Sequence, residues 1–307
     1  MGWNFFKKKN KPVAEMNGSK SHEAGDLNVI VLSDMGNIRT NNEDMGMFFK
    51  VADENVIREK GYLLIVADGM GGHQAGEVAS RMAGDIISRE YFNQPGNGAV
   101  EKNLAKAFAV ANKNIFEKAR SQKAYNGMGT TCTALVVIDQ TVYYAHVGDS
   151  RAYIQKGNSM VQITEDHTYV QELVNNGDIT AEEAATHPKR NILTNAMGTK
   201  PELRIDTGKC TFLLENNDKL LICSDGLYDY LSNEELKEIL QKEGLKNAAG
   251  FMINQAKTRG GHDNITVVLA QRAAVKEEKE DGLKLTRDID LPKLTKDADL
   301  PSDALSE

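Results

Sequence analysis

The sequence predicts an α+β fold built on antiparallel sheets. Nine segments are rich in the residues that favour strands, and five longer segments have helical periodicity. Several strand segments are separated by only a turn, which permits hairpins but not the longer crossover that parallel strands need. Because strands and helices are grouped rather than alternating, we expect antiparallel pairing and not repeated βαβ units.

The predicted elements can be given in chain order. The strands are Val29–Ser33, Met45–Val51, Gly61–Asp68, Thr130–Asp139, Thr141–Val147, Arg151–Gln155, Thr211–Leu214, Lys219–Ser224 and Asn264–Gln271. The helices are Ala75–Tyr91, Val100–Lys118, Thr168–Asn176, Asn233–Gln241 and Asn247–Lys257. Two pairs match the capping box that satisfies free N–H groups at a helix start, Thr180 with Glu183 and Ser232 with Glu235.

Length and composition restrict the class of protein. A chain of 307 residues can bury a sizeable core as one large domain or two small ones. Its net charge of −7 argues against a protein that coats nucleic acid, and no apolar run is long enough to span a membrane. The three cysteines are far apart and form no C-x-x-C pair, so we expect reduced thiols in a cytoplasmic protein.

Both ends of the chain differ in charge from the middle. Residues 1–24 carry five lysines and two glutamates, and we expect a basic disordered tail there. A folded domain is expected over residues 25–271, followed by an acidic disordered tail over 272–307. This second tail repeats a short sequence, Leu285–Pro292 and then Leu294–Pro301. The repeat is either a solvated linker or a pair of docking peptides for a partner protein.

Carboxylates recur beside glycine at the ends of predicted strands. The five places are Asn42–Asp44, Asp68–Gly72, Gly148–Arg151, Cys223–Gly226 and Gly260–Asn264. One isolated Asp-Gly pair is most often turn chemistry alone, but five acidic sites of this kind indicate a common site. A partly buried carboxylate cluster requires cations or protonation. Because no pair of histidines has zinc-ligand spacing, the oxygen donors favour Mg²⁺ or Mn²⁺.

These motifs, in this order, resemble the bacterial form of the metal-dependent Ser/Thr protein phosphatases of the protein phosphatase 2C family. The resemblance covers about residues 27–271. The matching segments are Arg39–Asp44, Asp68–Glu77, Gly129–Ala134, Ala145–Arg151, Asp166-His167, His187–Thr194, Asp225–Leu227 and Asp263–Val267.

The resemblance implies an α-β-β-α sandwich, with two antiparallel sheets between helix pairs and a flap subdomain at about 165–194. The metal ligands that it implies are Glu43, Asp44, Asp68, the Gly69 carbonyl, Asp149, Asp225 and Asp263. Asp68 would bridge two tightly bound Mn²⁺ or Mg²⁺ ions, and Asp149 with Asp225 would help to hold a third, weaker ion. Arg39, Asp44 and Asp68 are the expected catalytic residues, with Arg39 as a phosphate clamp. The alternative role for Arg39 is to neutralise Glu43 or Asp44.

The implied chemistry is hydrolysis by a hydroxide that bridges two metal ions. Some family members have a histidine directly after the Asp-Gly pair as a candidate general acid, but this chain has Met70 there. His73 is three residues further on and does not align with that position. A metal-bound water is therefore the expected proton donor.

The sequence leaves three functions to compare. The first is a cytoplasmic phosphatase that acts on phosphoserine and phosphothreonine in proteins and opposes a bacterial Ser/Thr kinase. The second is a non-catalytic regulator that binds phosphoproteins on the same fold, and the third is a hydrolase of small phosphoesters. The intact set of acidic residues favours an enzyme over the regulator.

Overall fold

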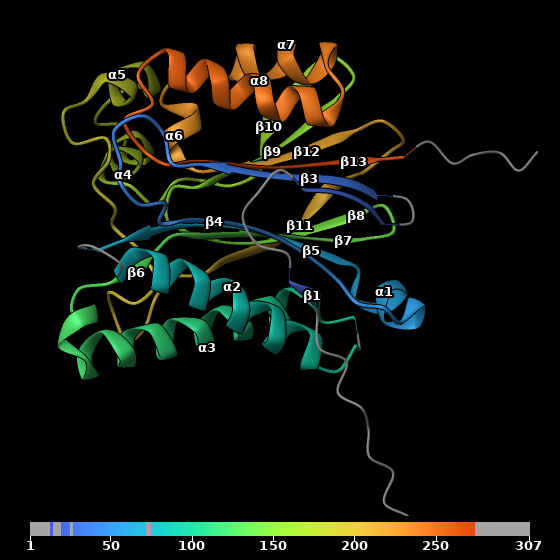
Figure 1. Cartoon of the computed structure of the whole chain (residues 1–307), viewed down its shortest axis with the longest axis horizontal. Helices are drawn as coiled ribbons and strands as arrows, with labels where there is room; N and C mark the ends of the chain where they lie inside the picture. Colours follow the sequence, from blue (N-terminus) through green and yellow to red (C-terminus); the bar gives the residue numbers. More distant parts are fainter. Residues whose placement is uncertain (1–12, 15–19, 25–26, 72–74, 97, 274–307) are drawn as a thin grey trace, which may run out of the picture. The chain divides into compact units, whose positions relative to one another are not determined.

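Two antiparallel sheets stacked face to face form the framework of the computed structural model, which describes residues 13–14, 20–24, 27–71, 75–96 and 98–273 (Figure 1). The first sheet has the strand order β1 (Val13–Ala14), β4 (Asp44–Lys50), β5 (Tyr62–Met70), β7 (Cys132–Ile138), β8 (Thr141–Val147) and β11 (Asp206–Leu213). The short strand β6 (Gly129–Thr130) pairs with β5. Helices α2 (Ala75–Asn93) and α3 (Val100–Ser121) cover the outer face of this sheet (Figure 1).

The second sheet contributes the other half of the sandwich. Its strand order is β10 (Ser159–Gln162), β9 (Arg151–Lys156), β12 (Lys219–Cys223), β13 (Ile265–Arg272), β3 (Leu27–Asp34) and β2 (Lys20–Ala24). Its outer face is covered by α6 (Asp225–Tyr228), α7 (Asn233–Lys242) and α8 (Leu245–Thr258).

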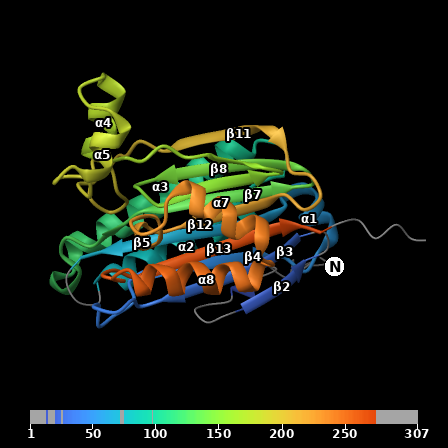
Figure 2. The same ribbon diagram turned by 90° about the horizontal axis from the view of Figure 1, so that it is seen from above.

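The remaining helices lie at the ends of the sheets. Helix α1 (Glu54–Lys60) connects β4 to β5, and a 3-10 turn, η1 (Lys123–Tyr125), follows α3. Helices α4 (Tyr169–Asn176) and α5 (Ala181–Thr186) form the flap, which projects at one end of the strands (Figure 2).

Three apolar layers hold the sandwich together, because both faces of the central strands are buried. In β5, Leu63 and Ile65 pack toward α2 and α3, whereas Leu64 and Val66 pack between the two sheets. A third layer lies between the second sheet and helices α6 to α8. Burial on both faces explains why these antiparallel strands have continuous apolar runs instead of alternating ones.

The α+β sandwich expected from the sequence is confirmed, and every predicted strand and helix is present with ends that differ by a few residues. The two predicted capping boxes are also present. The sequence does not predict β1, β2, β6, β10, α1, η1 or α6 as separate elements, and of α5 it predicts only the capping box at the start. All are short, and a short element gives little periodicity to detect.

The prediction of a disordered N-terminal tail over residues 1–24 is wrong for two segments. Lys20–Ala24 pairs along β3 at the edge of the second sheet, and Val13–Ala14 pairs with β4. The sequence K-S-H-E-A is polar, but a strand at a sheet edge is held by its backbone hydrogen bonds and needs no apolar pattern. Strand β13 extends one residue into the expected C-terminal tail, and residues 274–307, with the repeat, lie outside the described residues.

Among the residues with described structure, no helix is both long and apolar enough to cross a bilayer.

The turn after α1 provides a test of the packing. Gly61 has a φ of 68°, and a Cβ there would lie 2.0 Å from the carbonyl oxygen of Val137 in β7. We expect Gly61→Ala to lower the free energy of unfolding by about 2–4 kcal/mol, through backbone strain and overpacking together. Gly127→Ala is the control, since Gly127 also has a positive φ but has no neighbour within 4 Å of the added Cβ. Equal losses in urea unfolding of the two variants would contradict this packing.

Candidate metal and phosphate site

The acidic strand ends converge on one cavity of about 390 Å³. Its lining contains Arg39, Glu43, Asp68, Gly69, Met70, Gly71, Thr131, Asp149, Asn191, Leu193, Asp225 and Asp263. All of the site residues expected from the sequence are in this lining except Asp44. The Asp44 side chain is buried directly beside it, because Asp44 is the register partner of Asp68 across β4 and β5.

Asp68 is fixed by the strand next to it. Its backbone N–H donates to the Thr131 hydroxyl at 2.9 Å, and its carbonyl accepts from the Thr131 N–H at 2.8 Å. The Thr131 hydroxyl in turn contacts the Ser150 hydroxyl at 2.7 Å, one residue beyond Asp149. This chain of contacts ties Asp68 to the turn that carries Asp149.

Ser224 joins the two sheets at the site. Its hydroxyl donates to Asp44 Oδ2 at 2.6 Å and accepts from the Thr266 N–H at 3.0 Å. Asp225 follows directly as the first residue of α6. One buried hydroxyl therefore links the Asp44 carboxylate of the first sheet to the backbone of the second, directly before Asp225.

The Asn264 side chain fixes the β3–β4 connection, residues 35–43. Asn264 Oδ1 accepts from the Glu43 N–H at 2.8 Å, and its amide group donates to the carbonyls of Met35 and Asn41, each at 3.0 Å. The connection is thus held against the segment that carries Asp263.

Gly69 brings its backbone closer to the neighbouring backbone than any side chain would allow. A Cβ at Gly69 would lie 2.2 Å from the Gly76 carbonyl oxygen and 2.7 Å from the Glu43 carbonyl oxygen. The residue type at this position is therefore required by the packing of the acidic loop and not only by a turn.

Asp149 lies in the turn between β8 and β9, and the side chains of Tyr228 and Arg151 hold this turn in place. The Tyr228 hydroxyl donates to the Asp149 carbonyl at 3.0 Å. The Arg151 guanidinium lies 3.7 Å from the centre of the Tyr228 ring and forms a bidentate ion pair with Asp166. Such a planar fork is the strong form of an ion pair and gives the turn a fixed orientation.

Burial and mutual repulsion disfavour the charged forms of these carboxylates. Burial, with the nearby Asp263 charge, raises the pKa of Asp44 to about 6 against the hydrogen bond from Ser224. Burial and the charge of Asp166 raise the pKa of Asp149 to about 7. For Asp68 and Asp225, burial and then neighbouring carboxylates raise the pKa well above its ordinary value. Nearby positive charge would reverse these shifts.

The residues present fit divalent cations of the Mg²⁺ and Mn²⁺ class. The donors are carboxylate and carbonyl oxygens, which such hard cations prefer. Within the described part of the chain, Asp44 Oδ1 and Asp225 Oδ1 are buried oxygens with no hydrogen-bond partner, and both belong to this cluster. Among the described residues, no three acidic, histidine or cysteine side chains lie close enough together to hold a metal ion as they stand.

Arg39 lies at the edge of the cavity. Its guanidinium pairs with Asp263 Oδ2 at 2.6 Å, and both side chains are partly exposed. Arg39 therefore neutralises Asp263 rather than the expected Glu43 or Asp44. Its charge also lowers the pKa of Glu43, against the rise that burial causes. A phosphate would have access to the exposed part of this guanidinium.

Sequence reasoning missed several residues that shape the site. The sequence indicates Ser224 only within an acidic strand end, and Asn264, Asn191 and Leu193 only as members of the matching segments, and it assigns them no role of their own. A polar residue between a buried strand and an aspartate, as at Ser224, is the signal that could have been used. The predicted neighbour His73 lies outside the described residues.

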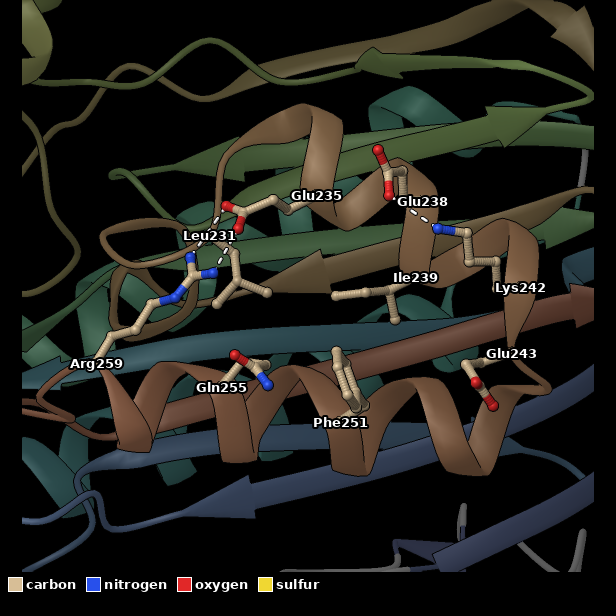
Figure 3. A pocket seen from close by; sticks show the side chains of 9 residues that line it. All are labelled: Leu231, Glu235, Glu238, Ile239, Lys242, Glu243, Phe251, Gln255 and Arg259. Atoms are coloured by element: carbon tan, nitrogen blue, oxygen red, sulfur yellow. Dashed lines mark hydrogen bonds and ion pairs between the residues drawn. The ribbon is translucent and has the colours of Figure 1, made fainter.

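A second cavity, of about 310 Å³, lies between α7 and α8 and shares no lining residue with the first (Figure 3). Its acidic side chains Glu235 and Glu238 are paired with Arg259 and Lys242. Two of its three glutamates are thus paired, so this cavity does not hold a carboxylate cluster like that of the first.

Comparison with known proteins places the chain among bacterial phosphatases. Residues 51–274 match the family model described as protein phosphatase 2C. The chain is 41% identical over 244 residues to the serine/threonine phosphatase stp of Listeria monocytogenes serovar 1/2a, covering 78% of this chain and 94% of that protein.

Two solved structures show the same likeness. Serine/threonine phosphatase Stp1 from Staphylococcus aureus has a TM-score of 0.71 at 35% identity, with 80% of this chain and 95% of that chain covered. The catalytic domain of the phosphatase PstP, solved in complex with two manganese ions, has a TM-score of 0.67 at 34% identity, with 81% and 99% covered.

The acidic cluster makes a prediction for the metal-free protein. A carboxyl whose pKa is raised on folding binds more protons in the folded than in the unfolded state, so stability falls as pH rises from about 4 through the raised pKa. In chelator, we expect the unfolding temperature to fall between pH 5 and pH 7.5. Asp225→Asn should raise it at pH 7.5 by about 2 °C or more and weaken the pH dependence, because one buried charge is gone.

Thermal unfolding in chelator measures both effects, with the exposed Asp178→Asn as control. A lower unfolding temperature for Asp225→Asn than for wild type at pH 7.5 would show that the buried carboxylates do not destabilise the metal-free protein by repelling one another.

Proposed function

The chain belongs to the protein phosphatase 2C family and is a Ser/Thr protein phosphatase, and we propose that it hydrolyses phosphoserine and phosphothreonine at a centre of two divalent cations. The convergence of Asp44, Asp68 and Asp225, with two unpartnered buried oxygens, carries the proposal. The manganese complex of the similar PstP domain supports the number of ions and the choice of Mn²⁺ or Mg²⁺.

The residues that would hold the two ions are Glu43, Asp44, Asp68, the Gly69 carbonyl, Asp225 and Asp263. Asp149 and Asp225 would contribute to a third and weaker position. When bound, such ions lower the pKa of water toward neutrality and offset the negative charge of the phosphoryl oxygens.

The chain's own groups orient the reaction around these ions. Ser224 holds the Asp44 carboxylate in one orientation through its hydroxyl, and Thr131 does the same for the Asp68 backbone. Arg39 binds two phosphate oxygens with its planar guanidinium and releases Asp263 when it does so. Met70 in the cavity wall has no proton to donate, so water delivers the proton to the leaving serine or threonine oxygen.

The cellular setting is proposed from the same chemistry. Phosphoserine and phosphothreonine in proteins are made by kinases, so the enzyme opposes a Ser/Thr kinase. The separate, unpaired cysteines fit the cytoplasm, where thiols stay reduced. Docking of a partner on the C-terminal repeat stays a prediction, because that segment lies outside the described residues.

Substrate comparison tests the proposal. With saturating Mn²⁺, we expect turnover of phosphoserine and phosphothreonine peptides and of p-nitrophenyl phosphate, and much slower turnover of nucleotides and sugar phosphates. Asp225→Asn should lose nearly all turnover while remaining folded, since its carboxylate serves more than one ion.

Turnover of Asp225→Asn within about tenfold of wild type would contradict the metal assignment. Absence of any hydrolysis by the wild-type protein would favour the alternative, a non-catalytic phosphoprotein-binding regulator.

Variants of Arg39 distinguish its two possible roles, phosphate binding and charge neutralisation. We expect Arg39→Ala to lower kcat/KM for a phosphopeptide by about 30-fold or more and to raise KM, because the bidentate contact is lost. Arg39→Lys should recover only part of the loss, since it restores the charge without the fork.

Mn²⁺ affinity, measured by calorimetry, is the control for this experiment. If Arg39→Ala mainly changes Mn²⁺ affinity and leaves KM level at saturating metal, Arg39 neutralises Asp263 and does not clamp phosphate.

A further inference from the structure

Exposed aliphatic side chains lie next in sequence to residues that line the catalytic cavity. Among the described residues, six large apolar side chains are exposed, and three of them are Met35, Ile38 and Ile192. Met35 and Ile38 lie in the β3–β4 connection, and Ile192 lies in the segment after α5. A single exposed apolar residue is ordinary, but several around one cavity indicate a binding surface.

The β3–β4 connection is anchored directly before Ile38. The backbone N–H of the preceding residue, Asn37, donates to the Gly261 carbonyl at 2.7 Å. Its side-chain amide donates to the carbonyls of Lys257 and Gly260 at 2.7 and 3.0 Å. Ile38 follows this anchored residue and is 64% exposed. The next residue is Arg39, in the cavity lining.

Ile192 is held in a similar way on the flap side. Its carbonyl accepts from the Tyr169 N–H at 2.8 Å, and its N–H donates to the Lys189 carbonyl at 3.2 Å. Both neighbours in sequence, Asn191 and Leu193, line the cavity. The flap and the β3–β4 connection lie at the same end of the two sheets in both views (Figures 1 and 2).

The cations beside Ile192 already have partners. Arg190 pairs with Asp229 at 3.6 Å, and the Lys189 ammonium lies 5.3 Å from the centre of the Tyr169 ring. Lys189 and Arg190 are exposed too, but each charge already has a partner, so the two isoleucines supply the aliphatic contact on this surface.

We propose that Ile38 and Ile192 are specificity-determining residues that contact aliphatic side chains flanking the phosphorylated residue of the substrate. The occupant is the substrate polypeptide itself, because each isoleucine adjoins residues of the cavity that takes the phosphate. The contacted positions are those that directly flank the phosphoresidue, because each isoleucine is next in sequence to a residue of the cavity lining. This inference rests on the proposed phosphatase function.

The test compares a phosphopeptide with p-nitrophenyl phosphate, which has no flanking residues. For Ile38→Ser and Ile192→Ser, we expect the ratio of kcat/KM for a Leu-flanked phosphopeptide to kcat/KM for p-nitrophenyl phosphate to fall about five- to tenfold. The matched control is Val161→Ser on β10, which is 57% exposed and absent from the cavity lining, and its ratio should not change.

Substrate variation gives a second measurement that does not depend on any variant folding. Wild-type protein should prefer Leu-flanked over Ala-flanked and Asp-flanked phosphopeptides, and the two serine variants should lose that preference. Equal ratios for all three variants, or a wild-type preference for Asp flanks, would overturn the inference. Failure to hydrolyse any phosphopeptide would instead overturn the proposed function.

Discussion

Repulsion among buried carboxylates is the interaction on which the rest of this structure depends. Asp44, Asp68, Asp149 and Asp225 lie at or beside one cavity, and burial with neighbouring negative charge raises the pKa of each. Such a cluster is unfavourable without cations or protons to neutralise it. The three apolar layers stabilise a fold that can hold these groups together despite the cost.

The two-sheet architecture determines which residues can meet. Asp44 and Asp68 come from neighbouring strands of one sheet, whereas Asp225 follows β12 and Asp263 precedes β13 in the other. The Ser224 hydroxyl connects Asp44 in the first sheet to the Thr266 backbone in the second. A small shift of one sheet relative to the other would therefore change the spacing of the donors, so the rigid core is part of the catalytic machinery.

The sequence predicted most of the framework because the informative elements are long and buried. Central strands such as β5 have continuous apolar runs, and α3 has a clear apolar stripe, so both are visible without a structure. Asp68 and Asp225 could be identified because each follows such a run. In contrast, β2 and α1 are short and polar, and their positions follow from pairing and capping that no local pattern reveals.

The missed parts of the site depend on contacts between distant residues. The hydrogen bond from Ser224 to Asp44 joins residues 180 apart in sequence, and the contact of Asn264 with Glu43 joins residues 221 apart. Arg39 could be expected to pair with its sequence neighbours, but the fold brings Asp263 closer. The two isoleucines at the cavity mouth, Ile38 and Ile192, were likewise visible only once exposure and cavity lining were known.

Proton release on metal binding tests the central claim most directly. If the carboxylates are held together by exchangeable protons in the metal-free protein, cations must displace those protons when they bind. Calorimetric titration with Mn²⁺ at pH 6, repeated in buffers of different ionisation enthalpy, counts them. We expect release of about one proton or more per protein molecule, because the raised pKa values leave the cluster partly protonated at this pH. Tight Mn²⁺ binding with no proton release would contradict this account.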